Sequence, residues 1–383
     1  MQFAVSCGVK RFYDGWMPTL VELRGLTVEL PTAGGWVRPV NEVSLKIEAG
    51  AALGLVGESG SGKTMLALAL VGLLPEGARV SGEAMLADAG ENPDATLIEA
   101  PRGCSEWHPD GKDESASGAP TAPKIDLAKM HGEEEWREIR GRRIAMVFQE
   151  PMSALNPVMR VGKQVGEAIR AHNPDMARAE VKRRAIEALE RAAVPEPELR
   201  ARQYPHELSG GLRQRALIAM AIAAGEAEMN GAKQIASGGR LLIADEPTTA
   251  LDVTVQKQIL ELLADLRHSL GLSLLFITHD LAVVGEVADR VAVMYAGRVV
   301  EEGPAAEVLR APRHPYTEGL LRASPTLKRG GFAAIPGTVP GLGALPPGCA
   351  FEPRCAKRVA ECARAVPEMR AAGEGHEARC VLV

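Results

Sequence analysis

The sequence predicts an α/β fold around a mostly parallel sheet, and three observations lead to this prediction. Unbroken apolar runs are typical of strands that are buried on both faces. A helix is expected between the last two runs, because Val255, Ile259 and Leu262 recur on one helical face and Gly271 can end it. A glycine-rich turn also joins the first run to a helical stretch. The four runs lie at 52–57, 143–149, 241–245 and 274–280.

The composition is that of a protein with a large core and no basic surface excess. The chain has 383 residues, 46% of them hydrophobic, and a formal net charge of −5. A nucleic-acid-binding domain would instead cluster Lys and Arg, so no nucleic-acid partner is expected. No run of 18 apolar residues and no signal peptide are visible, so we expect a location inside the cell.

Other segments mark the domain organisation. Residues 1–19 read as an N-terminal extension, 20–310 as the main domain, and 311–383 as a tail entered through Gly- and Pro-rich sequence. The stretch at 88–135 has little periodicity and reads as a surface insertion, with a shorter one at 225–239. The segment 291–303 predicts a hairpin that turns at Ala296-Gly297.

The turn after the first strand matches the phosphate-binding pattern G-x-x-x-x-G-K-[ST]. Backbone N–H groups of such a loop wrap a phosphate chain, and the following helix N-terminus adds its dipole. The lysine contributes a positive charge, and the threonine hydroxyl can bind Mg²⁺. A nucleoside triphosphate and Mg²⁺ are therefore the expected ligands. The loop comprises Gly57, Glu58, Ser59, Gly60, Ser61, Gly62, Lys63 and Thr64.

Polar residues at the ends of three other predicted strands complement this loop. Asp245 is placed to support Mg²⁺, and Glu246 to activate a water for attack on the γ-phosphate. His279 follows another strand, where an imidazole can contact the same phosphate, and Gln149 ends the strand at 143–149.

A second anion-receptive helix start lies about 150 residues downstream of the loop. Ser209 is a predicted helix N-cap with Gly210 and Gly211 behind it, followed by a long helical run. The two phosphate-reading elements either fold onto one nucleotide or are shared between two subunits.

Together these motifs, in this order, resemble the nucleotide-binding subunit of ABC transporters. The resemblance implies an ABC-type P-loop ATPase domain with an antiparallel β subdomain and a helical subdomain at about 150–225, plus a small Cys-containing C-terminal tail domain. It also implies a head-to-tail dimer in which ATP lies between the loop of one subunit and residues 209–211 of the other. Glu246, His279 and Gln149 are then the catalytic set, "TALD" at 249–252 is the D-loop, and Thr64, Gln149 and Asp245 serve Mg²⁺.

Four longer segments and the cysteine-bearing tail resemble, more specifically, the oligopeptide/dipeptide-importer ATPases; the segments lie at 140–167, 204–223, 241–260 and 314–321, and the tail at 348–380. This resemblance implies two transmembrane permease subunits, a sister ATPase in a heterodimer or a second copy in a homodimer, and a periplasmic or extracellular solute-binding protein. The subunit would sit at the cytoplasmic face of the inner membrane, with residues 150–166 against a permease. The adenine-stacking aromatic is left unassigned, Trp36 being the nearest.

Two other functions fit the sequence less well than that of an importer ATPase. A soluble ABC ATPase acting on DNA or ribosomes usually carries two cassettes or a coiled-coil insertion, which this chain lacks. A small-molecule kinase shares the phosphate loop but has no use for the helix that begins at Ser209.

Four cysteines gather in the tail, in the spacing C-x5-C-x6-C-x17-C. Such a quartet can ligate Zn²⁺ or hold a [4Fe–4S] cluster through thiolates, and it can equally be apolar packing or a redox pair. Disulfides are unusual in a reducing compartment. The resemblance adds that tails of some importer ATPases carry an iron–sulfur cluster. The four residues are Cys349, Cys355, Cys362 and Cys380.

Overall fold

The computed structural model describes residues 18–87, 124–229, 232–235, 239–324 and 334–383. Nearly all of the predicted N-terminal extension and most of the predicted insertion at 88–135 lie outside these ranges. The shorter insertion at 225–239 contains an antiparallel strand pair, β7 (Glu226–Met229) and β8 (Ala232–Ile235).

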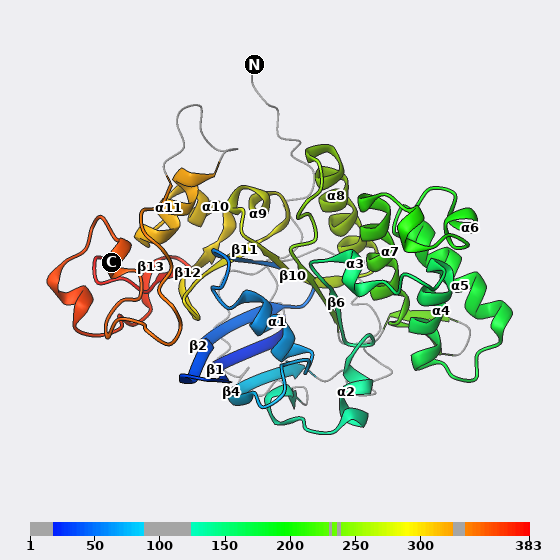
Figure 1. Ribbon diagram of the computed structural model, residues 1–383, viewed down its shortest axis with the longest axis horizontal. Coiled ribbons are helices and arrows are strands. Elements are labelled where there is room, and N and C mark those ends of the chain that lie inside the picture. The colour runs from blue at the N-terminus through cyan, green and yellow to red at the C-terminus, as the bar shows by residue number, and fades with distance from the viewer. Residues whose placement is uncertain (1–17, 88–123, 230–231, 236–238, 325–333) are drawn as a thin grey trace, which may run out of the picture.

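An eight-stranded sheet forms the centre of the molecule, and its strands β11, β3, β10, β9 and β6 run parallel (Figure 1). All four strands predicted from apolar runs are present in it. β3, β9 and β10 are buried along their whole length, which explains why their sequences do not alternate. In spatial order the strands are β13 (Arg370–Gly373), β14 (His376–Ala378), β12 (Arg298–Pro304), β11 (Arg290–Tyr295), β3 (Ala52–Val56), β10 (Leu272–Thr278), β9 (Arg240–Asp245) and β6 (Ile144–Val147).

A second, four-stranded antiparallel sheet packs beside the first, as the ABC resemblance implies. Its inward side chains, the helix α1 (Lys63–Leu70) and one face of the central sheet share a single hydrophobic core. The strands are, in spatial order, β2 (Gly35–Glu48), β1 (Thr19–Thr32), β4 (Arg79–Ala87) and β5 (Lys124–Asp126).

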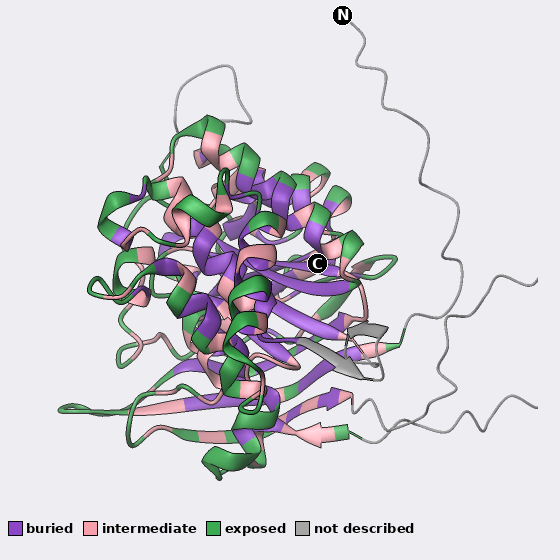
Figure 2. Ribbon diagram, turned by 90° about the vertical axis from the view of Figure 1, so that its right-hand side faces the viewer, coloured by how far each residue is buried: buried purple, intermediate pink, exposed green. Residues whose placement is uncertain are grey.

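Helices enclose the other face of the central sheet, and a second hydrophobic core lies between them. Figure 2 shows the buried central strands and the exposed outer surfaces of the helices. The helices on that face near the sheet are α8 (Val253–Ser269), α9 (Leu281–Val287), α10 (Ala305–Arg310) and α11 (Pro315–Ala323), whereas α1 packs on the opposite face. The helices η1 (Leu127–Lys129) and α2 (Glu133–Ile139) flank the antiparallel sheet. The group at the right of Figure 1 is α3 (Pro151–Ala154), α4 (Val161–His172), α5 (Arg178–Arg191), α6 (Pro197–Arg200), η2 (Pro205–Glu207) and α7 (Gly210–Ala223).

The predicted hairpin forms at the predicted residues. β11 and β12 pair antiparallel, and Ala296 (φ 48°) and Gly297 (φ 85°) turn the chain with two positive φ angles. Two consecutive positive φ angles are the requirement of the tight hairpin turn that follows the natural strand twist.

The tail joins the main fold instead of forming a separate globule. After η3 (Glu352–Arg354) and η4 (Ala360–Ala363), β14 pairs with β12, and β13 pairs with β14. The tail therefore extends the sheet that also carries the phosphate loop.

No helix of the described part of the chain has both the length and the apolar character needed to cross a bilayer.

Candidate functional site

The predicted phosphate loop connects β3 to α1, as its sequence context requires. Gly62, the residue before the helix, has φ +105°, and a Cβ there would come within 1.9 Å of the Pro39 carbonyl oxygen. At Gly57 a Cβ would lie 2.2 Å from the Met294 carbonyl oxygen. Both positions exclude a side chain, so the tight loop depends on these two glycines.

Lys63 lies inside the curve of this loop. Its Nζ donates to the carbonyl oxygens of Gly57 (2.8 Å) and Glu58 (3.0 Å) and to Ser61 Oγ (3.2 Å). Burial lowers the pKa of Lys63, and the carboxylates of Glu246 and Asp245 act in the opposite direction. The ammonium group is thus held in place by neutral oxygens, which charged phosphate oxygens can replace.

Asp245 lies at the end of β9 next to Thr64, which donates a hydrogen bond to its carboxylate. The side chain is 1% exposed, and its Oδ1 is buried with no hydrogen-bond partner. Burial raises the pKa of Asp245, although Thr64 and Lys63 lower it. A buried carboxylate oxygen without a partner is costly, and a cation is the ligand that would satisfy it. The residues present therefore fit Mg²⁺.

Glu246 brings the remaining predicted catalytic residues together. Its Oε2 accepts hydrogen bonds from Gln149 Nε2 (3.0 Å) and Thr249 Oγ1 (2.9 Å), and His279 Nδ1 lies 3.4 Å away. The hydrogen bond with His279 lowers the pKa of Glu246 and raises that of His279. The backbone of Glu246 has φ 44°, a left-handed conformation that residues other than glycine rarely adopt. Strands β6, β9 and β10 thus deliver Gln149, Glu246 and His279 to one point.

Ser209, Gly210 and Gly211 lie at the start of α7, where Ser209 Oγ accepts from the Leu212 N–H as the predicted N-cap. They face the start of α8, because a Cβ on Gly211 would be 2.6 Å from Val255 Cγ1. Among the described residues, no hydrogen bond joins residues 209–211 to the phosphate loop. Within the described part of one chain, this helix start therefore contacts the α8 region and makes no hydrogen bond to the loop.

The four tail cysteines converge on one cavity of about 10 Å³, although they come from separate turns. All four are free thiols, and burial raises the pKa of Cys349 to about 11. In the described ranges, no three or more His, Cys, Asp or Glu side chains are arranged as metal ligands. The residues form a thiol cluster, but as they stand they do not form a metal site.

Three contacts of the site were not expected from the motifs. Thr249 was predicted only as the first residue of the D-loop, and its hydroxyl contacts Glu246. Tyr316 and Arg354 bind Glu58 of the phosphate loop from positions more than 250 residues away. Their segments are visible in the sequence, but nothing local signals a partner so distant.

Trp36 is half exposed, and the guanidinium of Arg79 lies over its ring, 3.9 Å from the ring centre.

Comparison with known proteins agrees with this geometry. The family described as ABC transporter matches residues 40–249, and the C-terminal region of oligopeptide/dipeptide transporters matches residues 300–362.

Curated relatives match almost the whole chain. A protein of Brucella ovis named as a peptide import ATP-binding protein is 44% identical over 370 residues, covering 94% of this chain and 96% of the relative. The oligopeptide transport ATP-binding protein OppD of Bacillus subtilis is 43% identical over 337 residues, covering 87% and 80%.

Among solved structures, the ATP-binding cassette MJ0796 has the same fold, with a TM-score of 0.55 at 24% identity over 74% of this chain and 98% of that one. The chain belongs to the ABC transporter family, as an ATP-hydrolysing subunit with the C-terminal region of the oligopeptide/dipeptide transporters.

Proposed function

We propose that this chain hydrolyses ATP to power the import of di- or oligopeptides, or related small solutes, across the cytoplasmic membrane. The observation that carries the proposal is the Glu246 carboxylate, held by Gln149, Thr249 and His279 beside the phosphate loop. The names of the relatives support peptides as the cargo.

The phosphate loop would bind the nucleotide. Backbone N–H groups of residues 60–64 and the start of α1 would contact the phosphates. Lys63 would exchange its contacts with the Gly57 and Glu58 carbonyls for phosphate oxygens. The buried ammonium group would then have an anionic partner. That partner would offset the effect of burial, which lowers the pKa of Lys63.

Asp245, Thr64 and Gln149 are the residues that would serve Mg²⁺. Asp245 and Thr64 already share a hydrogen bond, and Asp245 Oδ1 lacks a partner. Bound there, Mg²⁺ would neutralise charge on the phosphate oxygens.

Glu246 would act as general base toward the attacking water. Its pKa is lowered, so the carboxylate is ionised at neutral pH and can accept a proton. The hydrogen bond with Glu246 raises the pKa of His279, which favours a positive charge on this ring near the γ-phosphate. Gln149 and Thr249 would keep the carboxylate in one orientation through their hydrogen bonds.

A second subunit would complete the site. Among the described residues, 209–211 make no hydrogen bond to their own loop, and their exposed helix start is suited to the phosphates bound by another subunit. We propose a head-to-tail dimer. The second subunit is a sister ATPase in a heterodimer or, as the alternative, a second copy of this chain in a homodimer.

An apolar groove supports docking to a permease. It has a volume of about 490 Å³ between the central sheet and α7, and its lining includes Leu73, Phe148 and Met220. Leu73 and Phe148 are exposed, as is Met152 on the neighbouring α3. Exposed apolar side chains around a groove are typical of a protein interface. We propose that a helix of one permease binds here, at the cytoplasmic face of the membrane, in a transporter that has two permease subunits and also uses a solute-binding protein.

For the cysteines, the iron–sulfur cluster implied by the family resemblance stays a proposal. Convergence of four thiols on one cavity supports it, whereas their present arrangement is not that of a metal site. Anaerobic purification with iron, sulfide and zinc analysis tests it. About four irons and four sulfides per chain, lost in Cys355→Ser, would support a [4Fe–4S] cluster. One zinc, or folded protein without metal, would contradict it.

ATP hydrolysis by wild-type protein and by Glu246→Gln tests the function. We expect the variant to bind ATP, to form a dimer that light scattering detects, and to lose turnover by at least about 100-fold, because the general base is missing. Wild-type turnover in the variant would show that Glu246 is not the base. Fractionation with co-produced permeases is the second arm, and recovery on ribosomes instead of membranes would contradict transport.

A further inference from the structure

The C-terminal region binds the second residue of the phosphate loop. Arg354 and Glu58 form a two-point ion pair, Nη1 to Oε2 at 2.7 Å and Nη2 to Oε1 at 3.0 Å. The Arg354 side chain is 5% exposed and that of Glu58 is 29% exposed. Paired, parallel hydrogen bonds of this kind fix orientation as well as distance.

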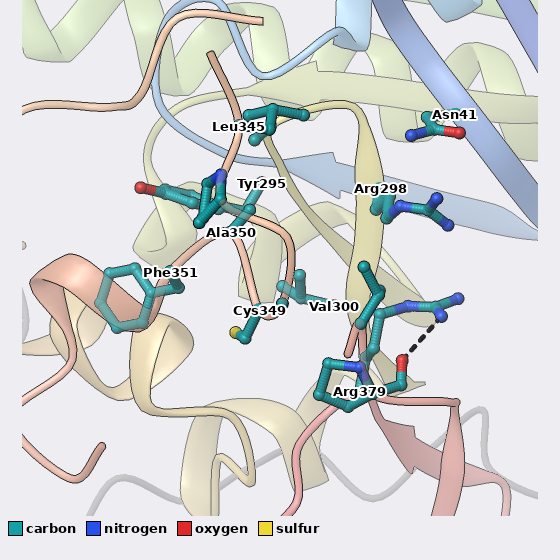
Figure 3. A pocket seen from close by; sticks show the side chains of 14 residues that line it. Asn41, Tyr295, Arg298, Val300, Leu345, Cys349, Ala350, Phe351 and Arg379 are labelled. Carbon is teal, nitrogen blue, oxygen red and sulfur yellow. Dashed lines mark hydrogen bonds between the residues drawn. The ribbon is translucent and has the colours of Figure 1, made fainter. Parts of the chain in front are cut away.

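A second contact reaches the backbone of the same residue. The Glu58 N–H donates to Tyr316 Oη at 2.8 Å. Tyr316 is fully buried and packs against Tyr295 and Phe351, with ring centres 4.6 and 5.3 Å away. Figure 3 shows Tyr295, Phe351 and Cys349 around the pocket between the tail and the β11–β12 hairpin. The Tyr316 hydroxyl, which accepts the hydrogen bond from the Glu58 N–H, is therefore held in a fixed position.

Arg354 is also fixed from its own side. Its Nε donates to the Pro336 carbonyl at 2.9 Å, and its guanidinium lies over the rings of Tyr295 and Phe351. It ends η3 and directly precedes Cys355, one of the cavity cysteines. A buried guanidinium needs its carboxylate partner, so the tail can pack in this way only if Glu58 stays in place.

Glu58 connects these contacts to Lys63. Its carbonyl oxygen accepts from Lys63 Nζ at 3.0 Å and from the Ser61 N–H at 3.2 Å. All polar groups of Glu58 are thus used: the carboxylate and N–H bind the tail region, and the carbonyl binds the loop. A displacement of Arg354 would therefore be transmitted to the group that holds the phosphate-binding lysine.

We propose that Arg354 is a positioning residue for ATP binding: through Glu58 it sets the conformation of the phosphate loop, assisted by Tyr316. The inference rests on the proposed ATPase function and extends it, because it makes nucleotide affinity depend on the folded state of the cysteine-bearing tail. In this proposal Arg354 acts only through Glu58, with which it forms the two-point ion pair.

The competing explanation is that Arg354 merely anchors the tail. Loss of an anchor would lower the melting temperature but would leave the KM for ATP of the folded enzyme unchanged. Loss of a positioning residue would raise KM more than it lowers kcat, and it would do so only when Glu58 is present to transmit the effect.

The experiment measures KM and kcat for ATP in the full chain, with melting temperatures alongside. The variants are Arg354→Gln, Arg354→Lys, Glu58→Gln, the Arg354→Gln/Glu58→Gln double variant, and Tyr316→Phe, which removes only the hydroxyl. The matched control is Arg358→Gln, because Arg358 lies four residues further along the chain but its side chain is 61% exposed. Wild-type turnover is measured first, so that failure of the ATPase proposal is recognised separately.

We expect about a tenfold rise of KM in Arg354→Gln, a smaller rise in Arg354→Lys and Tyr316→Phe, and no change in Arg358→Gln. The double variant should match either single variant within about twofold, since contacting residues that act as a unit are not additive. Unchanged KM in the folded Glu58→Gln and Tyr316→Phe proteins, beside an active wild type, would overturn this inference alone. A wild type that neither binds nor hydrolyses ATP would overturn the proposed function together with it.

Discussion

His314 should make the stability of this protein depend on pH in a defined window. The ring is fully buried before α11, and its Nδ1 accepts the Tyr316 N–H at 3.1 Å, so the neutral imidazole is the form that fits. Burial, with a smaller effect of Arg379, lowers the pKa of His314 from 6.5 to about 3. The backbone N–H of His314 is bound by Glu301, which leaves the ring little freedom to move toward water.

The sign follows from proton uptake. Below pH 6.5 the unfolded chain binds a proton at this histidine that the folded chain does not bind. The contribution to stability is therefore complete above pH 6.5 and is lost as the pH falls toward 3. Between about pH 7 and pH 5 the loss amounts to about 2 kcal/mol of unfolding free energy.

Urea unfolding at several pH values measures this effect against His314→Asn. Asparagine also caps helices but does not titrate, so the variant keeps the cap and loses the dependence. As the pH falls from about 7 to about 5, the unfolding free energy of the wild type should fall by about 2 kcal/mol relative to that of the variant. His268→Asn, at an exposed position near the end of α8, is the control and should follow wild type. Parallel pH profiles of wild type and His314→Asn would refute the reasoning.

Two further substitutions test the loop and the core. Gly62→Ala should weaken ATP binding at least about tenfold, since the new Cβ would meet the Pro39 carbonyl and φ is +105°; in a fluorescent-nucleotide titration, Gly271→Ala, also at positive φ but in open space, should bind like wild type. Phe276→Ala, at a fully buried position of β10, should cost about 3–5 kcal/mol of unfolding free energy. The same change at the exposed Phe148 should cost less than about 1 kcal/mol, and equal losses at both positions would contradict the burial pattern.

Local chemistry explains why much of the fold is predictable. Ser209 and Asp252 cap α7 and α8 with their own side chains, and Ala296-Gly297 turns the hairpin, so these features need no knowledge of distant residues. The unbroken apolar runs of β3, β9 and β10 likewise indicate strands in a sheet that is covered on both faces.

Distant pairings account for what the sequence leaves open. β14 is three residues long and only partly buried, so its sequence is too short to show a strand pattern. It is a strand because it pairs with β12. The Arg354–Glu58 pair joins residues 296 positions apart, and neither residue stands out in its segment. In the site, the individual catalytic positions can be named from motifs, whereas the hydrogen bond of Thr249 to Glu246 depends on the exact path of the chain after β9.

The pairing of the tail strands with β12 also bears on how the protein avoids self-association. An uncovered edge strand presents free N–H and C=O groups on which another chain can add a strand. β14 occupies that position on β12, and the outermost strand is then β13, which is four residues long, mostly exposed and begins with Arg370. Short, charged borders of this kind discourage edge-to-edge aggregation. The last residues of the sheet thus contribute to solubility in a crowded cell, independently of nucleotide chemistry.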